Sequence, residues 1–235
     1  MGQDADWMEP PGRARRKGKD SVYLDLFHNP RYGIRLVQSF HPEMELTESD
    51  IEYLSLHSVL MAELYNDLGI LVKDRLIVCS EAQSTWSLNV LVRMFLYLAE
   101  TYHRYIQKHE EMNIYGAKKI ILPMPECYVI YTGSEKNRPE FLSLSEEFFG
   151  KDSPLELRVK VITKPGTGNI VEEYIRFCHV FNEQVRHHGY TRHAIEETIL
   201  ACRSENVLAD YLQEREKEVE TIMMTLFSQE EATRR

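Results

Sequence analysis

The sequence has little of what defines several large classes of protein. Its four cysteines are scattered over 235 residues, and no two of them form a Cys-x-x-Cys pair. This spacing argues against a disulfide framework and a zinc ribbon, and is typical of a reducing compartment. No apolar run approaches the roughly 18 residues of a membrane span, and the N-terminus lacks the apolar region of a signal peptide. We therefore expect a cytoplasmic protein with no membrane partner.

Excess positive charge is also missing. The formal net charge of −9 does not favour nucleic acid as a partner, although a local basic surface can contact phosphates in an acidic protein. Residues 12–19 (GRARRKGK) carry five basic side chains and no acid. They form either a solvated tail or an arm that adds non-specific attraction to nucleic acid. We assign residues 1–20 to a disordered basic tail.

Two motifs that invite a functional interpretation are incomplete. The loop Lys164–Asn169 (KPGTGN) lacks the lysine and the hydroxyl residue that complete a Walker A motif, so it predicts a turn before a helix. His187, His188 and His193 have no carboxylate or cysteine at a spacing that would complete a metal site. A histidine-rich loop at a helix end is the favoured interpretation.

The remaining pattern predicts an α/β protein. Residues 21–40 have helical spacing with a break at Asn29-Pro30, and Thr47 with Asp50 can cap a short helix in the loop that follows. Residues 55–65 fit a strand or a helix. The apolar residues of Leu88–Ile106 cover more than one face, which predicts a buried helix.

Further strands and helices follow along the chain. Residues 126–133, 141–144 and 155–162 favour strands, so that with the hairpin described below the sheet should contain four or five mixed strands. Residues 170–186, 191–203 and 207–227 should be three helices. We place the core domain at residues 21–186 and a helical C-terminal extension at residues 187–235.

The centre of the chain predicts a β-hairpin with acidic and amide groups at one end. Two short apolar runs, 68–72 and 76–79, are separated by the charged residues 73–75. Asp67 opens the first run, and Glu81 and Gln83 close the second, two positions apart and hence on one side of a strand. A two-residue turn would pair Asp67 with Ser80. A three-residue connection, or a bulge, would place it opposite Glu81.

In the second register these groups suit a magnesium ion. Asp67 and Glu81 supply two carboxylates and the backbone carbonyl of Ala82 a third oxygen, and the carboxylates should lie roughly 4–5 Å apart. Gln83 can orient water or phosphate, but its amide is neither a base nor a charge. The alternative is a solvated sheet edge in which Glu81 pairs with Arg93.

The sequence segments around these residues resemble those of a known protein family. Lys19–Pro30 (KDSVYLDLFHNP) and Leu64–Ile106, which includes EAQSTWS, resemble the Rpn-type family of PD-(D/E)xK proteins, recombination-promoting nucleases and putative transposases. The EAQSTWS word is similar to a branch common in gut bacteria. The resemblance implies a restriction-endonuclease-like fold, a mixed β-sheet flanked by α-helices, that hydrolyses DNA with Mg²⁺ or Mn²⁺.

The resemblance also implies roles for particular residues. Asp67 and Glu81 take the two acidic positions of the motif, and Gln83 stands where many members have lysine. Arg93 and Tyr97 match an arginine and a tyrosine on the helix after the motif, where they would approach phosphate or the second shell of the metal. A buried structural pairing is the alternative for both.

Two functional hypotheses follow. The first is a Mg²⁺-dependent DNA endonuclease of low sequence specificity that acts in DNA recombination or transposition, and a homodimer would suit the cutting of two strands. The second is a catalytically weak or inactive nuclease-fold protein that binds nucleic acid or mediates oligomerisation. The net charge and the glutamine at position 83 favour the second.

Overall fold

The computed structural model describes residues 22–54, 67–135, 137–164 and 168–233, without the side chains of Asp67 and residues 226–233. The basic tail predicted for residues 1–20 and the stretch 55–65 lie outside the described residues. Contacts divide the chain into two compact units, Leu24–Ile175 and a second one that contains Arg176–Arg235. Within the described ranges, no helix is both long enough and apolar enough to cross a membrane.

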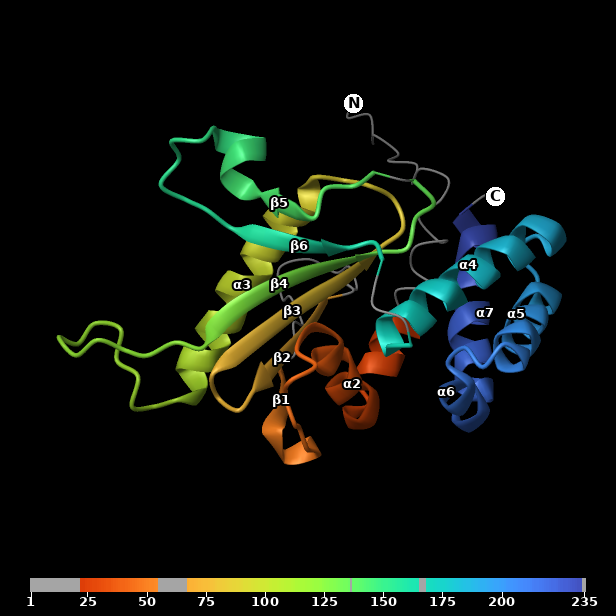
Figure 1. Cartoon of the computed structure of the whole chain (residues 1–235), viewed down its shortest axis with the longest axis horizontal. Coiled ribbons are helices and arrows are strands. Elements are labelled where there is room, and N and C mark those ends of the chain that lie inside the picture. The colour runs from red at the N-terminus through yellow and green to blue at the C-terminus, as the bar shows by residue number, and fades with distance from the viewer. Residues whose placement is uncertain (1–21, 55–66, 136, 165–167, 234–235) are drawn as a thin grey trace, which may run out of the picture. The chain divides into compact units, whose positions relative to one another are not determined.

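The first unit is built on a mixed sheet of six strands in the order β1-β2-β3-β4-β6-β5 (Figure 1). The strands are β1 (Ile51–Leu54), β2 (Asp67–Val72), β3 (Leu76–Gln83), β4 (Met124–Tyr131), β5 (Phe141–Ser143) and β6 (Arg158–Ile162). Neighbouring strands β3, β4 and β6 are parallel, whereas β1, β2 and β5 run antiparallel to their neighbours. The predicted α/β class is confirmed.

The sheet has one strand more than the sequence predicted. No strand was predicted for Ile51–Leu54, since four residues are too few to give a clear periodic signal. Its pairing with β2, from Ile51 opposite Val72 to Leu54 opposite Gly69, makes it a strand. The prediction of four or five strands is therefore wrong, and the pairing partner explains the difference.

The connection between β2 and β3 has three residues. Val72 pairs with Leu76, and the N–H of Arg75 donates to the carbonyl of Val72 at 3.0 Å. Lys73 and Asp74 have φ values of 48° and 53°, in the left-handed region. This turn sets the register of the whole hairpin and confirms the three-residue alternative.

Helix α3 (Asn89–Lys108) connects the parallel neighbours β3 and β4 and lies along one face of the sheet (Figure 1). Its buried residues pack against odd-numbered positions of β3 and β4, such as Ile77 and Val129. The helix is as predicted, but the prediction that it is buried holds for one face only. Val92 and Leu96 are 38% and 53% exposed, because the helix covers the sheet with one face only.

Helix α2 (Pro30–Phe40) packs against the other face of the sheet. Residues 22–27 and α2 are separate helices, as the break at Asn29-Pro30 predicted, and the side chain of Asn29 caps α2. The ring of Phe40 stacks on Tyr128 of β4 with centroids 3.8 Å apart. Two short helical segments, η1 (Glu48–Asp50) and η2 (Ser145–Phe149), interrupt the loops, and Thr47 with Asp50 forms the predicted capping box at η1.

The chain ends in four helices, α4 (Ile170–His188), α5 (Arg192–Ser204), α6 (Ala209–Glu214) and α7 (Glu216–Thr233). The first two agree with the predicted spans. The single helix predicted for residues 207–227 is wrong, because Arg215 leaves the helical conformation with φ of −129°. The break lets Tyr211 of α6 and Val219 of α7 both be fully buried.

Candidate active site

The predicted site lies at the carboxyl end of β3. Glu81 and Gln83 follow Ile77 and Cys79 at a period of two, so they share the sheet face that α3 covers. The backbone of Asp67 pairs directly with that of Glu81, and directly opposed positions of an antiparallel pair belong to one face. The register therefore places the three predicted positions on one face. The side chain of Asp67 is outside the described part of the structure, so the predicted distance between the two carboxylates stays a prediction.

Glu81 is held by an ion pair with Arg93 of α3. The carboxylate is 7% exposed, and the guanidinium Nε donates to Oε2 at 3.2 Å while Nη2 donates to Oε1. Both carboxylate oxygens therefore have a charged donor. This is the pairing that the sequence left as the structural alternative, and it compensates a charge that would be costly to bury alone.

Gln83 has an oxygen without a donor. The residue is 8% exposed, and its Nε2 makes one long hydrogen bond, 3.4 Å, to the carbonyl of Ser87. Its Oε1 is buried and accepts no hydrogen bond from any described atom. Leaving such an acceptor unpaired costs about 1–3 kcal/mol, so nearly all buried polar atoms have partners. This oxygen is available to a cation or to a donor group of a ligand.

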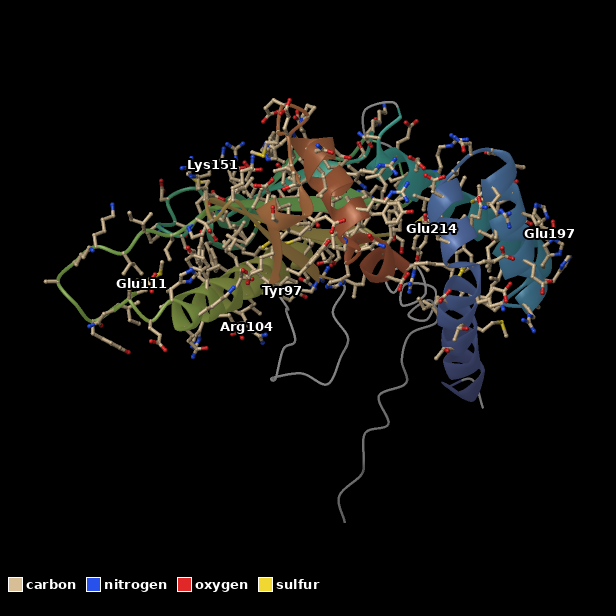
Figure 2. All side chains as sticks on the ribbon, turned by 90° about the horizontal axis from the view of Figure 1, so that it is seen from below. Tyr97, Arg104, Glu111, Lys151, Glu197 and Glu214 are labelled. Atoms are coloured by element: carbon tan, nitrogen blue, oxygen red, sulfur yellow. The ribbon has the colours of Figure 1, made fainter. Side chains whose placement is uncertain are left out.

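The other predicted residues lie around these two. Tyr97 follows Arg93 by one helical turn, is buried, and belongs to the hydrophobic core beneath α3, the helix on which Figure 2 labels it together with Arg104. Ala82 is buried between Glu81 and Gln83. The roles predicted for Tyr97 in phosphate contact and for the Ala82 carbonyl in metal binding stay predictions.

The donor set suits a hard divalent cation in its chemistry. Glu81, Gln83 and the Ala82 carbonyl would offer only oxygen, which Mg²⁺ prefers, and magnesium takes just one or two protein carboxylates. The unpartnered Oε1 of Gln83 is the observation that fits an added ligand. Within the described residues, however, no three His, Cys, Asp or Glu side chains gather to hold a metal.

Sequence reasoning missed an aromatic and cationic group beside Gln83. Tyr131 pairs with Gln83 across β3 and β4, and its ring lies perpendicular to that of Trp86, with the ring centroids 5.7 Å apart. The guanidinium of Arg138 lies 4.4 Å from the Trp86 ring and 5.5 Å from the Tyr131 ring, and it pairs with Glu135. Trp86 belongs to the EAQSTWS word, but nothing in the loop sequence around Arg138 indicates its return to this end of the sheet.

Comparisons with known proteins add no relative. No protein-family model, no curated protein and no solved structure matches this chain.

Proposed function

We propose that this protein is a metal-dependent DNA endonuclease with a restriction-endonuclease-like core, of the Rpn-type class and with low sequence specificity. The observation that carries the proposal is the register that pairs Asp67 with Glu81. A shift by one residue would have put the two acids on opposite faces. The unpartnered amide oxygen of Gln83 on the same face supports it.

The residues have distinct tasks in this mechanism. Asp67, Glu81 and the Ala82 carbonyl would hold Mg²⁺ or Mn²⁺, which supplies a Lewis acid for the scissile phosphate and the attacking water. Gln83 orients the water or a phosphate oxygen through its amide. Gln83 carries no charge, so it cannot stabilise the negative charge that develops on the phosphate as a lysine would. Another positively charged side chain has to do so.

Arg93 is the nearest source of that charge. Its side chain is 30% exposed and its guanidinium contacts Glu81, so it would lie next to a phosphate bound at Glu81. If Glu81 held a cation through one oxygen, the N–H group of Arg93 that donates to that oxygen could donate to a phosphate oxygen instead. Arginine suits this exchange because its planar donors match carboxylate and phosphate equally.

The competing function is a nuclease-fold module that binds nucleic acid or oligomerises without cleavage. One observation favours it: both oxygens of Glu81 already accept hydrogen bonds from Arg93. A pair so well compensated has less tendency to bind a metal. In that case Glu81 and Arg93 connect α3 to the sheet and have no part in chemistry.

The test is incubation of supercoiled plasmid with the full chain and Mg²⁺ or Mn²⁺. We expect nicking by the wild type and at least a tenfold loss in Glu81→Gln, which keeps the side-chain volume and removes the charge. A matched control is Glu100→Gln, which breaks the partly exposed pair of Glu100 with Arg104 on the same helix as Arg93. This control should nick like the wild type.

Metal titration by calorimetry, without DNA, separates the two functions. Binding of Mn²⁺ that disappears in both Asp67→Asn and Glu81→Gln supports the endonuclease. Absence of nicking in either metal at high protein concentration, together with absence of metal binding, would replace the endonuclease by the binding module.

A further inference from the structure

A cavity of about 350 Å³ opens at the carboxyl end of β6, within the unit Leu24–Ile175. Its walls come from the end of α2, the loop before β5, the end of β6 and the start of α4. The lining residues that matter here are Ser39, Arg138, Glu140, Lys160, Thr163, Lys164 and Asn169. The carboxyl ends of parallel strands are the common place for ligands in α/β sheets, and the volume lies in the range of small-molecule sites.

The cavity concentrates positive charge in an acidic protein. Among the described lining residues are three cations, Arg138, Lys160 and Lys164, and one acid, Glu140, and Arg138 also pairs with Glu135 outside the lining, whereas the whole chain has a net charge of −9. No described carboxylate forms an ion pair with the ammonium group of Lys160 or of Lys164 within 4.0 Å. Unpaired lysines in a partly enclosed space attract an anion.

The neutral groups of the cavity add donors. The amide oxygen of Asn169 accepts from the N–H of Glu172, so its amide nitrogen keeps both hydrogens for another partner. Thr163 makes no hydrogen bond through its hydroxyl within the described part of the chain, although Ser39 uses its own to donate to the carbonyl of Arg35. The acids of the first turn of α4 do not line the cavity, since Glu172 accepts from Gly168 and Glu173 pairs with Arg35 elsewhere.

We propose that this cavity binds a phosphate group. Two lysines without a described ion pair and two neutral donors, with Arg138 beside them, match the several acceptor oxygens of a tetrahedral dianion better than the two oxygens of a planar carboxylate. The cavity is larger than a single phosphate, so it has room for the attached part of a phosphate ester. The site needs no metal and does not depend on nuclease activity.

Two sources offer this chemistry, a nucleic-acid strand and a small phosphorylated molecule. Arg138 contacts the rings of Trp86 and Tyr131, beside Gln83, so the cavity adjoins the candidate active site. Two strand spacings, or about 10 Å, separate the ends of β3 and β6. A nucleic acid at Glu81 would therefore have a second phosphate within reach of the cavity.

Calorimetric titration with inorganic phosphate tests the site, in EDTA and at low ionic strength. We expect a dissociation constant at or below about 1 mM for the wild type, and at least a tenfold weaker one for the double variant Lys160→Gln/Lys164→Gln. The matched control Lys118→Gln/Lys119→Gln removes the same charge from an exposed loop and should bind like the wild type. Glu140→Gln should bind phosphate severalfold more tightly.

Fluorescence anisotropy with a single-stranded oligonucleotide, also in EDTA, distinguishes the two sources. Loss of DNA affinity in the Lys160/Lys164 variant but not in the control, with competition by phosphate, assigns the site to nucleic acid. Unchanged DNA affinity, with phosphate binding lost, assigns it to a small phosphorylated molecule. No binding of phosphate by the wild type up to about 10 mM, or equal loss in the two double variants, would overturn the proposal.

Discussion

Arg93 on α3 donates hydrogen bonds to both carboxylate oxygens of Glu81 on β3, and Glu81 is almost completely buried. The pair joins the helix of the βαβ unit to the strand that carries the candidate site. The same carboxylate is thus a structural partner of Arg93 and a proposed ligand of a cation. A substitution that breaks the pair should therefore change both the free energy of unfolding and the affinity for a cation, and both can be measured.

Arg93→Ala should lower the free energy of unfolding by about 3 kcal/mol, because it leaves the buried carboxylate of Glu81 without a compensating charge. The change is measured by urea denaturation. Mg²⁺ should restore part of the loss if Glu81 binds it, since a ligand of the native state stabilises that state. The control Glu100→Gln breaks the pair of Glu100 with Arg104, whose side chains are 44% and 31% exposed, and should cost no more than about 1 kcal/mol. Equal costs for the two variants would contradict the structural role of the Glu81 pair.

Gln83→Leu tests whether the unpartnered amide serves function. The substitution keeps a similar volume and removes a buried oxygen that has no donor, so stability should change by less than about 1 kcal/mol. Plasmid nicking should fall at least tenfold if Gln83 orients water or phosphate. A variant that nicks like the wild type would remove Gln83 from the mechanism.

Gly33→Ala should destabilise the contact between α2 and β1. A Cβ atom at this position would lie 2.1 Å from the hydroxyl oxygen of Tyr53, which donates to the carbonyl of Phe27 at 2.8 Å. The hydroxyl has to move and the hydrogen bond is lost, at a cost of about 1–3 kcal/mol. In a Tyr53→Phe background the same substitution should cost less, because the clashing oxygen is gone. Thermal denaturation of the wild type, the two single variants and the double variant measures how far the two substitutions depend on each other. If their effects on stability simply add, the clash with the Tyr53 hydroxyl is not the cause.

The partly buried hydroxyl of Tyr102 should make the protein less stable at alkaline pH. Burial, and secondarily the negative potential of Cys79 and Cys127, raises the pKa of Tyr102 to about 12, and its hydroxyl donates to the carbonyl of Pro123 at 2.6 Å. The unfolded chain releases this proton near pH 10, so the contribution is complete below pH 10 and is lost as the pH rises to 12.

The measurement is the unfolding free energy of Tyr102→Phe and of the wild type between pH 8 and 12. The variant should be less stable below pH 10 by about 1 kcal/mol, owing to the lost hydrogen bond, and the difference should shrink above pH 10. Tyr115→Phe is the control, since Tyr115 is 93% exposed and should change neither value. A constant difference over the whole range would show that Tyr102 does not titrate in this way.

The elements that sequence predicted well are those with a local, periodic signal. The hairpin strands, α3 and the break at Asn29-Pro30 each follow from neighbours within one or two turns of chain. The strand Ile51–Leu54 was not predicted because its hydrogen-bond partners belong to β2. The helix break at Arg215 was not predicted because it depends on how two helices pack. Long-range partners decided both.

By itself, the sequence determined that two acids and an amide stand at one end of a β-hairpin, and which helix follows them. Only the tertiary structure decided the register of β2 and β3. It depends on the left-handed conformation of Lys73 and Asp74, which the sequence did not predict. The tertiary structure also decided that Glu81 meets Arg93, and that Arg138, Lys160 and Lys164 line one cavity. Periodicity acts between neighbours in the chain, whereas ion pairs and cavities form between residues that only the folded sheet brings together.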